Sequence, residues 1–156
     1  HQFTLATCNK SSVYQRMVVI REWSFTRRTI IFHTDIRSRK ITQLKNNPNC
    51  SLLFYSHKDK LQLRFSCISH IHQHDKISDY FFNKASIRQL KLYSYAQAPS
   101  EVLNNANTKT VEPRSNFSIV VCNFSELEIL SLSKNNEKHL YTWDKHGHCF
   151  IKELVA

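Results

Sequence analysis

Glycine is almost absent from this sequence: Gly147 is the single glycine among 156 residues. The fingerprint of dinucleotide-binding folds requires two or three clustered glycines, and a phosphate-binding P-loop requires two. Both motifs are therefore excluded. A phosphate group that binds this chain must be held by side chains and by a helix terminus, because no glycine-lined backbone cradle can form.

Long hydrophobic runs and paired cysteine motifs are also missing. No apolar run approaches the ~20 residues that a membrane-spanning helix needs, and no signal peptide is recognised. The five cysteines are far apart, odd in number, and form no Cys-x-x-Cys motif. We interpret them as reduced, mostly buried thiols of a cytoplasmic protein. They are Cys8, Cys50, Cys67, Cys122 and Cys149.

Positive charge, in contrast, is abundant: the net charge is +10 with histidine neutral. Such a chain attracts anionic ligands and polyanions. The basic residues are spread through the predicted strands and turns rather than gathered in a tail. A generally basic surface is the simplest explanation, so the charge alone does not choose between a small anion and a nucleic acid.

Apolar alternation and short connections predict seven or eight antiparallel strands and three short helices, which is a mostly β barrel with helical insertions. We expect residues 1–156 to form one domain. The predicted strands cover 3–8, 13–22, 29–33, 50–55, 61–67 and 117–122, with a closing meander over 126–132, 139–143 and 148–155. The predicted helices cover 40–46, a segment capped by Asp75, and 87–96 with a capping box at Ser86. A polar connection spans 99–116.

The segment 30–48 predicts an anion site. It begins as a β-branched apolar strand and ends as a short helix that Pro48 stops. Unpaired N–H groups at a helix start point toward a ligand, and arginine can bind a phosphate with two parallel hydrogen bonds. A solvated basic turn is an equally simple explanation of this segment taken alone. The turn carries three cations and two hydroxyls: Arg37, Arg39, Lys40, Thr34 and Ser38.

Five blocks, in order and with consistent spacing, resemble the pyridoxine/pyridoxamine 5'-phosphate oxidase family. The blocks are Tyr-Gln-Arg-Met-Val-Val-Ile-Arg at 14–21, Phe-His-Thr at 32–34, Ser-Arg-Lys at 38–40, Asn-Asn-Pro at 46–48, and Gln62. The resemblance covers about 3–97 and resumes more weakly from 117. It implies an antiparallel split β-barrel with α insertions, FMN as the cofactor, and a homodimer with the flavin at its interface.

The resemblance also implies roles for individual residues toward FMN. Arg16, Arg39 and Lys40 hold the phosphate, with Thr34 and Ser38 nearby. The backbone of Met17, Val18, Val19 and Ile20 runs along the edge of the isoalloxazine ring. Gln62 bonds the polar ring atoms, and Gln97 comes from the partner subunit. His33 stands where the family usually has an aromatic residue.

A second set of implied residues faces the substrate. Arg21 lies near the flavin or the substrate phosphate, where the family usually has lysine. Tyr80 and Lys84 match the tyrosine and arginine that grip that phosphate, and Arg88 aligns with a serine of the same site. Phe81 and Tyr80 are otherwise expected in the core, and Cys67 is expected to pack there.

Two departures from the family pattern lie in the C-terminal part. Leu130 replaces a tryptophan near the flavin, and the family's Arg-x-His-x-Arg aligns with Lys134-Asn135-Asn136-Glu137-Lys138. Lys134, Lys138 and Arg88 still predict a basic mouth. The expected function is therefore an FMN-dependent oxidoreductase with an altered, anionic substrate.

Two alternatives stay open: a flavin-binding carrier or sensor without turnover, and a basic barrel that binds nucleic acid. We favour flavin over nucleic acid because the cations fall at flavin-motif positions. A third possibility concerns the alternating histidines His70, His72 and His74, which suggest a metal site. No suitably spaced fourth ligand is evident, so a solvated strand end is the preferred interpretation. The same holds for His146 and His148.

Overall fold

The computed structural model describes residues 2–102, 109–132 and 136–156. The chain is mostly β. Its strands are β1 (Gln2–Asn9), β2 (Ser12–Ser24), β3 (Thr29–Asp35), β4 (Asn49–Ser56), β5 (Leu61–His72), β6 (Phe117–Ser131), β7 (Glu137–Trp143) and β8 (Cys149–Leu154). Its helices are α1 (Arg39–Asn46), α2 (Lys76–Lys84), α3 (Ile87–Leu90), the 3₁₀ turn η1 (Lys91–Tyr93) and α4 (Pro113–Asn116).

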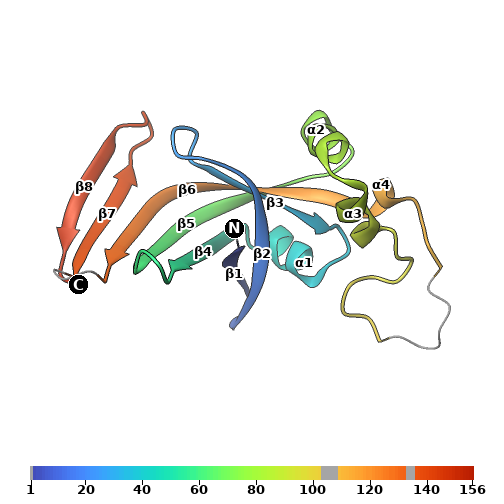
Figure 1. Ribbon diagram of the computed structural model, residues 1–156, viewed down its shortest axis with the longest axis horizontal. Coiled ribbons are helices and arrows are strands. Elements are labelled where there is room, and N and C mark those ends of the chain that lie inside the picture. Colours follow the sequence, from blue (N-terminus) through green and yellow to red (C-terminus); the bar gives the residue numbers. More distant parts are fainter. Residues whose placement is uncertain (1, 103–108, 133–135) are drawn as a thin grey trace.

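The strands form one antiparallel sheet in the order β3-β2-β1-β4-β5-β6-β7-β8, and β3 also pairs with β6. That extra pairing closes the first six strands into a barrel. The strands β7 and β8 extend the sheet beyond it, on the side away from the helices (Figure 1). The predicted antiparallel split barrel with helical insertions is confirmed.

The barrel is split along β2. Residues 12–19 of β2 pair with β1, whereas the pairing with β3 begins only at Ile20, opposite Phe32. Arg21 is the extra residue of a bulge, because Glu22 is the next to find a partner in β3. A bulge redirects the strand and its side chains. The first half of β2 therefore presents a backbone edge beside the turn that leads from β3 into α1.

The barrel interior holds the main core, which includes the fully buried Leu5, Phe32 and Leu52. The helix α1 closes one end of the barrel, since Ile41 and Leu44 belong to the same buried cluster. These two residues are three apart in a helix and so share one face, as predicted. Burial of this apolar stripe fixes the start of α1 against β1 and β2.

A second apolar cluster lies on the outer face of β3 and β6. The helical segment after β5 covers this face, and α2, α3 and α4 gather beside it in Figure 1. The predicted cap at Asp75 and the predicted capping box of Ser86 and Gln89 are both present, and Asp75 forms a capping box of its own with Ser78. The cluster consists of Ile31, Phe81, Tyr93, Phe117 and Ile119.

Two predicted boundaries are wrong. The strands expected at 117–122 and 126–132 form one continuous strand, β6. The polar residues between them are absorbed by a bulge, because Ser66 pairs with Glu126 and Cys67 with Phe124, which leaves Ser125 as the extra residue. The helix expected at 87–96 ends at η1, because side chains elsewhere bind the carbonyls that a longer helix would use.

Three of the cysteines are buried as predicted: Cys50, Cys67 and Cys122. The Sγ atoms of Cys50 and Cys122 lie 3.9 Å apart within the barrel, and Cys67 packs in the same cluster. None of the five is in a disulfide. Among the helices of the described ranges, none combines the length and apolarity needed to cross a bilayer.

Candidate functional site

Lys40, Thr34 and Ser38 form a polar cluster where β3 turns into α1. Lys40 Nζ donates a hydrogen bond to Thr34 Oγ1 over 3.0 Å, and Thr34 Oγ1 lies 3.3 Å from Ser38 Oγ. Both hydroxyl residues are buried. Ser38 is the N-cap residue of α1, yet its side chain makes no capping hydrogen bond. The N–H of Ile41 donates to the Ser38 carbonyl over 2.9 Å, so the N–H groups of Arg39 and Lys40 are the ones that keep the capacity to bind a ligand.

Arg16 contacts α1 at Gln43, which lies one helical turn after Lys40. Its Nη1 donates to Thr7 Oγ1 over 2.5 Å, and its Nη2 donates to Gln43 Oε1 over 2.7 Å. Thr7 also donates to Gln43 Oε1 over 2.6 Å, and both partners are buried. The guanidinium is thus held in one orientation by β1 and α1, and none of these partners is a carboxylate.

The electrostatics of this cluster favour an anion. Burial and the positive charge of Arg16 lower the pKa of Lys40, and Asp35 opposes that shift. Burial also lowers the pKa of Arg16. The first turn of α1 carries no acidic residue, and a helix N-terminus is itself positive. Two partly buried cations beside a helix start are costly without an anion, so the arrangement suits a phosphate.

Sequence reasoning missed the two polar residues that orient Arg16. Thr7 sits on the inward face of β1, and Gln43 lies between the core residues Ile41 and Leu44 of α1. A buried polar residue within an apolar pattern is the signal that could have identified each of them.

Arg37 does not join this cluster, although the sequence grouped it with the other cations. Its guanidinium binds Asp35 through two hydrogen bonds of 2.7 and 3.0 Å. The remaining donors bind backbone carbonyls of the segment 95–97. Arg39 is exposed at the start of α1. The anion cluster therefore contains Arg16 and Lys40, with Arg39 at its rim.

The β2 residues that are predicted to contact the flavin ring lie on both faces of the sheet. Val18 points into the core, whereas Met17 and Val19 are exposed on the outer face of β2. Gln62 is half-buried on β5, where it pairs with Tyr55 of β4 and Leu130 of β6. Neither β4 nor β5 pairs with β2, so Gln62 is not a strand neighbour of the β2 edge within one chain.

Four buried polar atoms lack a partner among the described residues: Arg21 Nε, His33 Nδ1 and Nε2, and Gln97 Oε1. The His33 ring lies edge-on to Phe81 and Phe117, with centroids 5.8 and 4.9 Å away. Burial and the charge of Arg21 lower the pKa of His33 to about 4, so its imidazole is neutral at pH 7. Orphaned buried polar atoms are rare in complete structures, and all three residues were predicted at the flavin or substrate.

The predicted substrate-phosphate residues lie on the helices. Lys84 Nζ donates to the Tyr80 hydroxyl and lies 4.4 Å from the centroid of that ring. The hydrogen bond to Tyr80 is the main cause that raises the pKa of Lys84, and the charge of Glu22 adds to it. Lys84 is thus close to the residue after Arg21. Tyr80 is 51% exposed, so its expected core location is wrong, whereas Phe81 is buried as expected.

Two of the three residues of the predicted basic mouth lie far apart in the part of the chain that the structure describes. Arg88 is exposed on α3, and Lys138 lies on β7 at the opposite end of the molecule (Figure 1). Lys138 Nζ lies 3.6 Å from a carboxylate oxygen of the buried Glu128, which Arg64 also binds over 2.6 Å. Lys134 falls outside the described residues.

The histidine positions do not assemble a metal site in the part of the chain that the structure describes, where no group of three His, Cys, Asp or Glu residues has suitable geometry. His70 and His72 lie on β5, and His74 follows that strand. His72 Nδ1 is 2.7 Å from the carboxylate of Asp75. His148 makes a similar contact with Asp144, 2.9 Å away.

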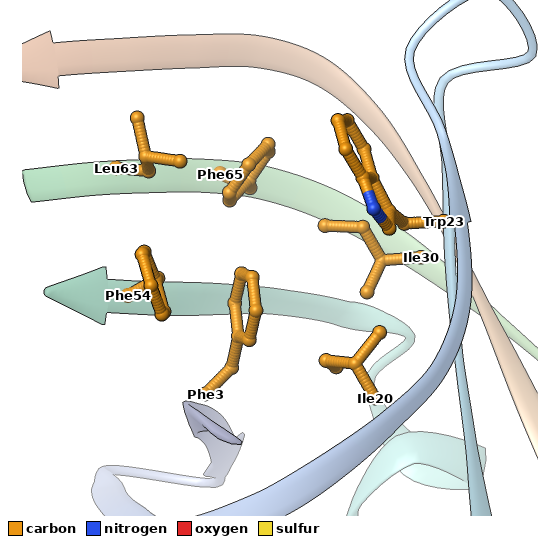
Figure 2. Close-up of a pocket in the computed structure, with 7 residues that line it drawn as sticks. All are labelled: Phe3, Ile20, Trp23, Ile30, Phe54, Leu63 and Phe65. Carbon is orange, nitrogen blue, oxygen red and sulfur yellow. The ribbon is translucent and has the colours of Figure 1, made fainter. Parts of the chain in front are cut away.

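An apolar cavity of about 170 Å³ opens at the barrel end that α1 does not close (Figure 2). Its lining contains no cation or hydroxyl, so it does not fit a phosphate. The lining residues are Phe3, Ile20, Trp23, Ile30, Phe54, Leu63 and Phe65. A more polar pocket of about 360 Å³ lies by Asp35 and Gln97, along the segment 95–101.

Comparison with known sequences agrees with this geometry. Residues 1–73 match the family model described as pyridoxamine 5'-phosphate oxidase, FMN-binding domain. The pyridoxine/pyridoxamine 5'-phosphate oxidase of Psychrobacter cryohalolentis is 34% identical over 107 residues, which cover 67% of this chain and 48% of that protein. The Shewanella amazonensis oxidase is 32% identical over 85 residues, covering 54% and 39%. The chain thus spans less than half the length of these relatives.

Solved structures share the fold. A pyridoxamine 5'-phosphate oxidase-related, FMN-binding protein from Nostoc punctiforme superposes with a TM-score of 0.88 at 15% identity, covering 99% of this chain and 88% of that chain. PhzG from Burkholderia lata gives a TM-score of 0.77 at 17% identity, covering 99% and 81%. At these identities the likeness concerns the fold. Taken with the sequence matches and the closed six-strand barrel, it identifies the chain as a divergent member of the pyridoxamine 5'-phosphate oxidase-like family of FMN-binding split barrels.

Proposed function

We propose that this chain binds FMN and works as an FMN-dependent oxidoreductase on a small anionic substrate. The observation that carries the proposal is the pairing of Arg16 and Lys40 beside the start of α1. A phosphomonoester such as that of FMN carries nearly two negative charges at neutral pH. It offsets the repulsion between these two cations and accepts hydrogen bonds from both of them.

The donor set of this cluster fits a terminal phosphate better than a neutral ligand. Lys40 supplies an ammonium, Thr34 and Ser38 supply hydroxyls, and α1 supplies backbone N–H groups. Arg16 is held in place by Thr7 and Gln43, so its orientation costs little on binding. The edge of β2 at Met17–Val19 that faces away from β1 does not pair with β3, and it supports the ring of the same ligand through backbone groups.

Bound FMN supplies the hydride and electron chemistry, while the protein positions and tunes it. The residues around Arg21 then act on the substrate. Arg21 and Lys84 carry positive charges near Glu22, and the Tyr80 hydroxyl lies beside Lys84. Together with Arg88 on α3, these groups favour a substrate that bears a phosphate or carboxylate.

The proposal includes a homodimer, because one chain does not supply all of the predicted flavin contacts. One chain leaves Gln62 on β5, away from the edge of β2, and leaves Gln97 Oε1 without a partner. It also exposes Met17 and Val19 on the face where the flavin ring is proposed to bind. A second copy that covers this face brings its own polar side chains to the ring and encloses the flavin between the two barrels.

Two observations favour a flavin carrier or sensor without turnover as the second candidate. Leu130 offers no aromatic wall, and Lys138 is engaged by Glu128 rather than free for a substrate. The two candidates agree on FMN and differ only in catalysis. Anaerobic mixing of the oxidised, FMN-loaded protein with anionic candidate substrates separates them, because an oxidoreductase reduces its FMN at the expense of the substrate, whereas a carrier keeps FMN oxidised.

The experiment that tests the proposal is a titration of the purified chain with FMN and, separately, with riboflavin. Riboflavin lacks the phosphate, so FMN should bind at least ~10-fold more tightly if one charge-assisted hydrogen bond is lost. Equal affinities for the two flavins place the phosphate elsewhere. Binding of a short nucleic acid with no binding of FMN favours the basic barrel instead.

A further inference from the structure

The turn between β3 and α1 has a second polar face, which holds the segment 95–97. Arg37 Nη1 donates to the carbonyl of Ala96 over 2.7 Å. Its Nη2 donates to the carbonyls of Tyr95 and Gln97 over 3.0 and 3.2 Å. One guanidinium therefore binds three consecutive carbonyls, across almost sixty residues of sequence.

Arg37 is itself fixed by Asp35. The buried Asp35 carboxylate accepts from Nε and Nη2 of Arg37 and from its backbone N–H, the last over 2.8 Å. The hydrogen bond that Arg37 donates to Asp35 is the main cause that raises the pKa of Arg37, so the charge of its guanidinium is permanent. A planar guanidinium held in this way has little rotational freedom left.

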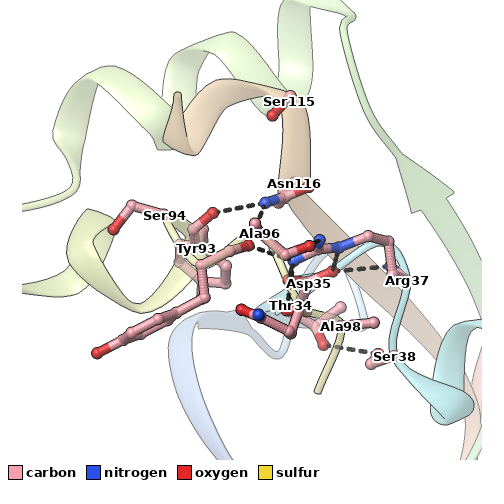
Figure 3. Close-up of polar contacts among 12 residues, drawn as sticks. Thr34, Asp35, Arg37, Ser38, Tyr93, Ser94, Ala96, Ala98, Ser115 and Asn116 are labelled. Carbon is pink, nitrogen blue, oxygen red and sulfur yellow. Dashed lines mark hydrogen bonds and ion pairs between the residues drawn. The ribbon is translucent and has the colours of Figure 1, made fainter. Parts of the chain in front are cut away.

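Asn116 binds the same segment from the other side. Its Nδ2 donates to the carbonyls of Tyr93 and Tyr95 over 2.8 and 3.2 Å. The carbonyl of Asn116 accepts from the N–H of Ile36 over 2.9 Å, which ties it to the β3–α1 turn. Figure 3 shows Asp35, Arg37 and Asn116 converging on this stretch of backbone. These bonds are the reason why the helical turn ends at Tyr93.

The same turn therefore serves two neighbours. Thr34, Ser38 and Lys40 face the anion cluster, whereas Asp35 and Arg37 alternate with them and face the segment 95–97. Within that segment, the amide of Gln97 is half-buried, and its Oε1 lacks a partner among the described residues. The backbone carbonyls of the segment 95–97 accept hydrogen bonds from Arg37, whereas Gln97 Oε1 accepts none from the described residues.

We propose that Arg37 is a positioning residue of the flavin site, which fixes Gln97 so that its amide meets the polar edge of the flavin ring. This inference rests on the proposed FMN function. Arg37 does not touch the flavin; it acts through Gln97. In the homodimer, the Gln97 amide serves the flavin that the other copy holds.

The test is a double-mutant cycle on FMN affinity with Arg37→Lys, Gln97→Ala and the combined variant. Arg37→Lys keeps a cation beside the buried Asp35, which avoids an uncompensated carboxylate. An ammonium cannot reproduce the planar fork that holds three carbonyls. The matched control is Arg27→Lys, because Arg27 is an exposed arginine that pairs with Glu22 over 2.9 Å.

Arg37→Lys should raise the Kd for FMN about fivefold or more, the loss of one hydrogen bond to the ring, while Arg27→Lys leaves it unchanged. Riboflavin affinity should fall by the same factor, because Gln97 serves the ring and not the phosphate. Adding Arg37→Lys to Gln97→Ala should cause no further loss, since both changes remove one contact. Thermal unfolding of the apo variants checks that each is folded.

Three results overturn the inference: unchanged FMN affinity in Arg37→Lys, additive losses in the combined variant, or a loss confined to FMN and not seen with riboflavin. The last result would mean that Arg37 supports the turn that binds the phosphate, and not the position of Gln97. Failure of the wild-type chain to bind FMN is a separate outcome, which contradicts the proposed function itself.

Discussion

Lys40 Nζ donates a hydrogen bond to Thr34 Oγ1 over 3.0 Å, and this bond joins the end of β3 to the first turn of α1. The bond holds the lysine over the helix N-terminus, on the same side as Arg16. The positive charge of Arg16 contributes to lowering the pKa of Lys40, so the two cations are close enough to repel each other. The proposal places the phosphate of FMN at these two cations, where its negative charge would offset the repulsion.

Removal of either cation should therefore weaken FMN binding. Arg16→Ala and Lys40→Ala each delete a charge-assisted hydrogen bond to phosphate, worth about 1.5–3 kcal/mol. The Kd for FMN should rise at least ~10-fold in each variant, by fluorescence titration. Lys45→Ala is the control, because Lys45 lies in the last turn of the same helix. Unchanged affinity in both site variants places the phosphate elsewhere.

The stability of the fold should depend on His33 in mildly acidic solution. The pKa of His33 is about 4 in the folded protein, against 6.5 for an unperturbed histidine such as that of the unfolded chain. Between these values the unfolded chain binds a proton that the folded chain does not, so stability falls as pH falls from 6.5 toward 4. Above pH 6.5 neither state is protonated, and the effect vanishes.

Urea unfolding of wild type and His33→Phe at pH 7 and pH 5 measures this effect. Phenylalanine suits the site, since Phe81 and Phe117 already contact the ring. The wild type should lose more stability between the two pH values than the variant does. Asp75 and Asp144, whose pKa values are lowered, titrate equally in both proteins and cancel in the comparison. An identical loss in both proteins shows that His33 does not titrate as described.

The chain should be a dimer in solution. Light scattering of the FMN-bound protein should report twice the mass of one 18.4 kDa chain. The reason is that the flavin ring has only the β2 edge and two exposed apolar side chains on one copy. A monomer that retains bound FMN contradicts this prediction, and also the assignment of Gln97 to a second copy.

Pyridoxamine 5'-phosphate should be oxidised poorly or not at all. Tyr80, Lys84 and Arg21 address only a phosphate, and Leu130 provides no aromatic wall beside the ring. A substrate held by its phosphate alone is poorly aligned, and a misplacement of ~1 Å can cost ~100-fold in rate. The measurement is a stopped assay for aldehyde and peroxide under air. Turnover near the enzyme median of ~10 per second shows instead an ordinary oxidase.

Local signals in the sequence predicted the elements well. The cap at Asp75, the capping box at Ser86 and the stop at Pro48 depend on residues within four positions of each other, and the structure places all three as expected. The single glycine also behaves as a turn residue: Gly147 has φ +86° in the turn from Asp144, a conformation that favours glycine.

The candidate site was predictable only in part, because its contacts join distant residues. Arg16 meets Gln43 across 27 positions, and only the family resemblance placed Arg16 and Lys40 together. An arginine in a basic turn gives the same sequence signal whether its side chain binds a ligand or backbone carbonyls of the same chain. The sequence therefore grouped Arg37 with the anion site, although it binds the segment 95–97. The continuity of β6 was missed because a bulge at Ser125 hides the polar interruption.

The most direct test of the account is the flavin content of the purified chain. The protein is reconstituted with a mixture of FMN, FAD and riboflavin, separated from free flavin, denatured, and its released ligand identified by mass spectrometry. The account predicts FMN, at one per chain, with the yield lost in the Arg16→Ala, Lys40→Ala double variant. Recovery of FAD, or of no flavin from a folded wild-type protein, contradicts it.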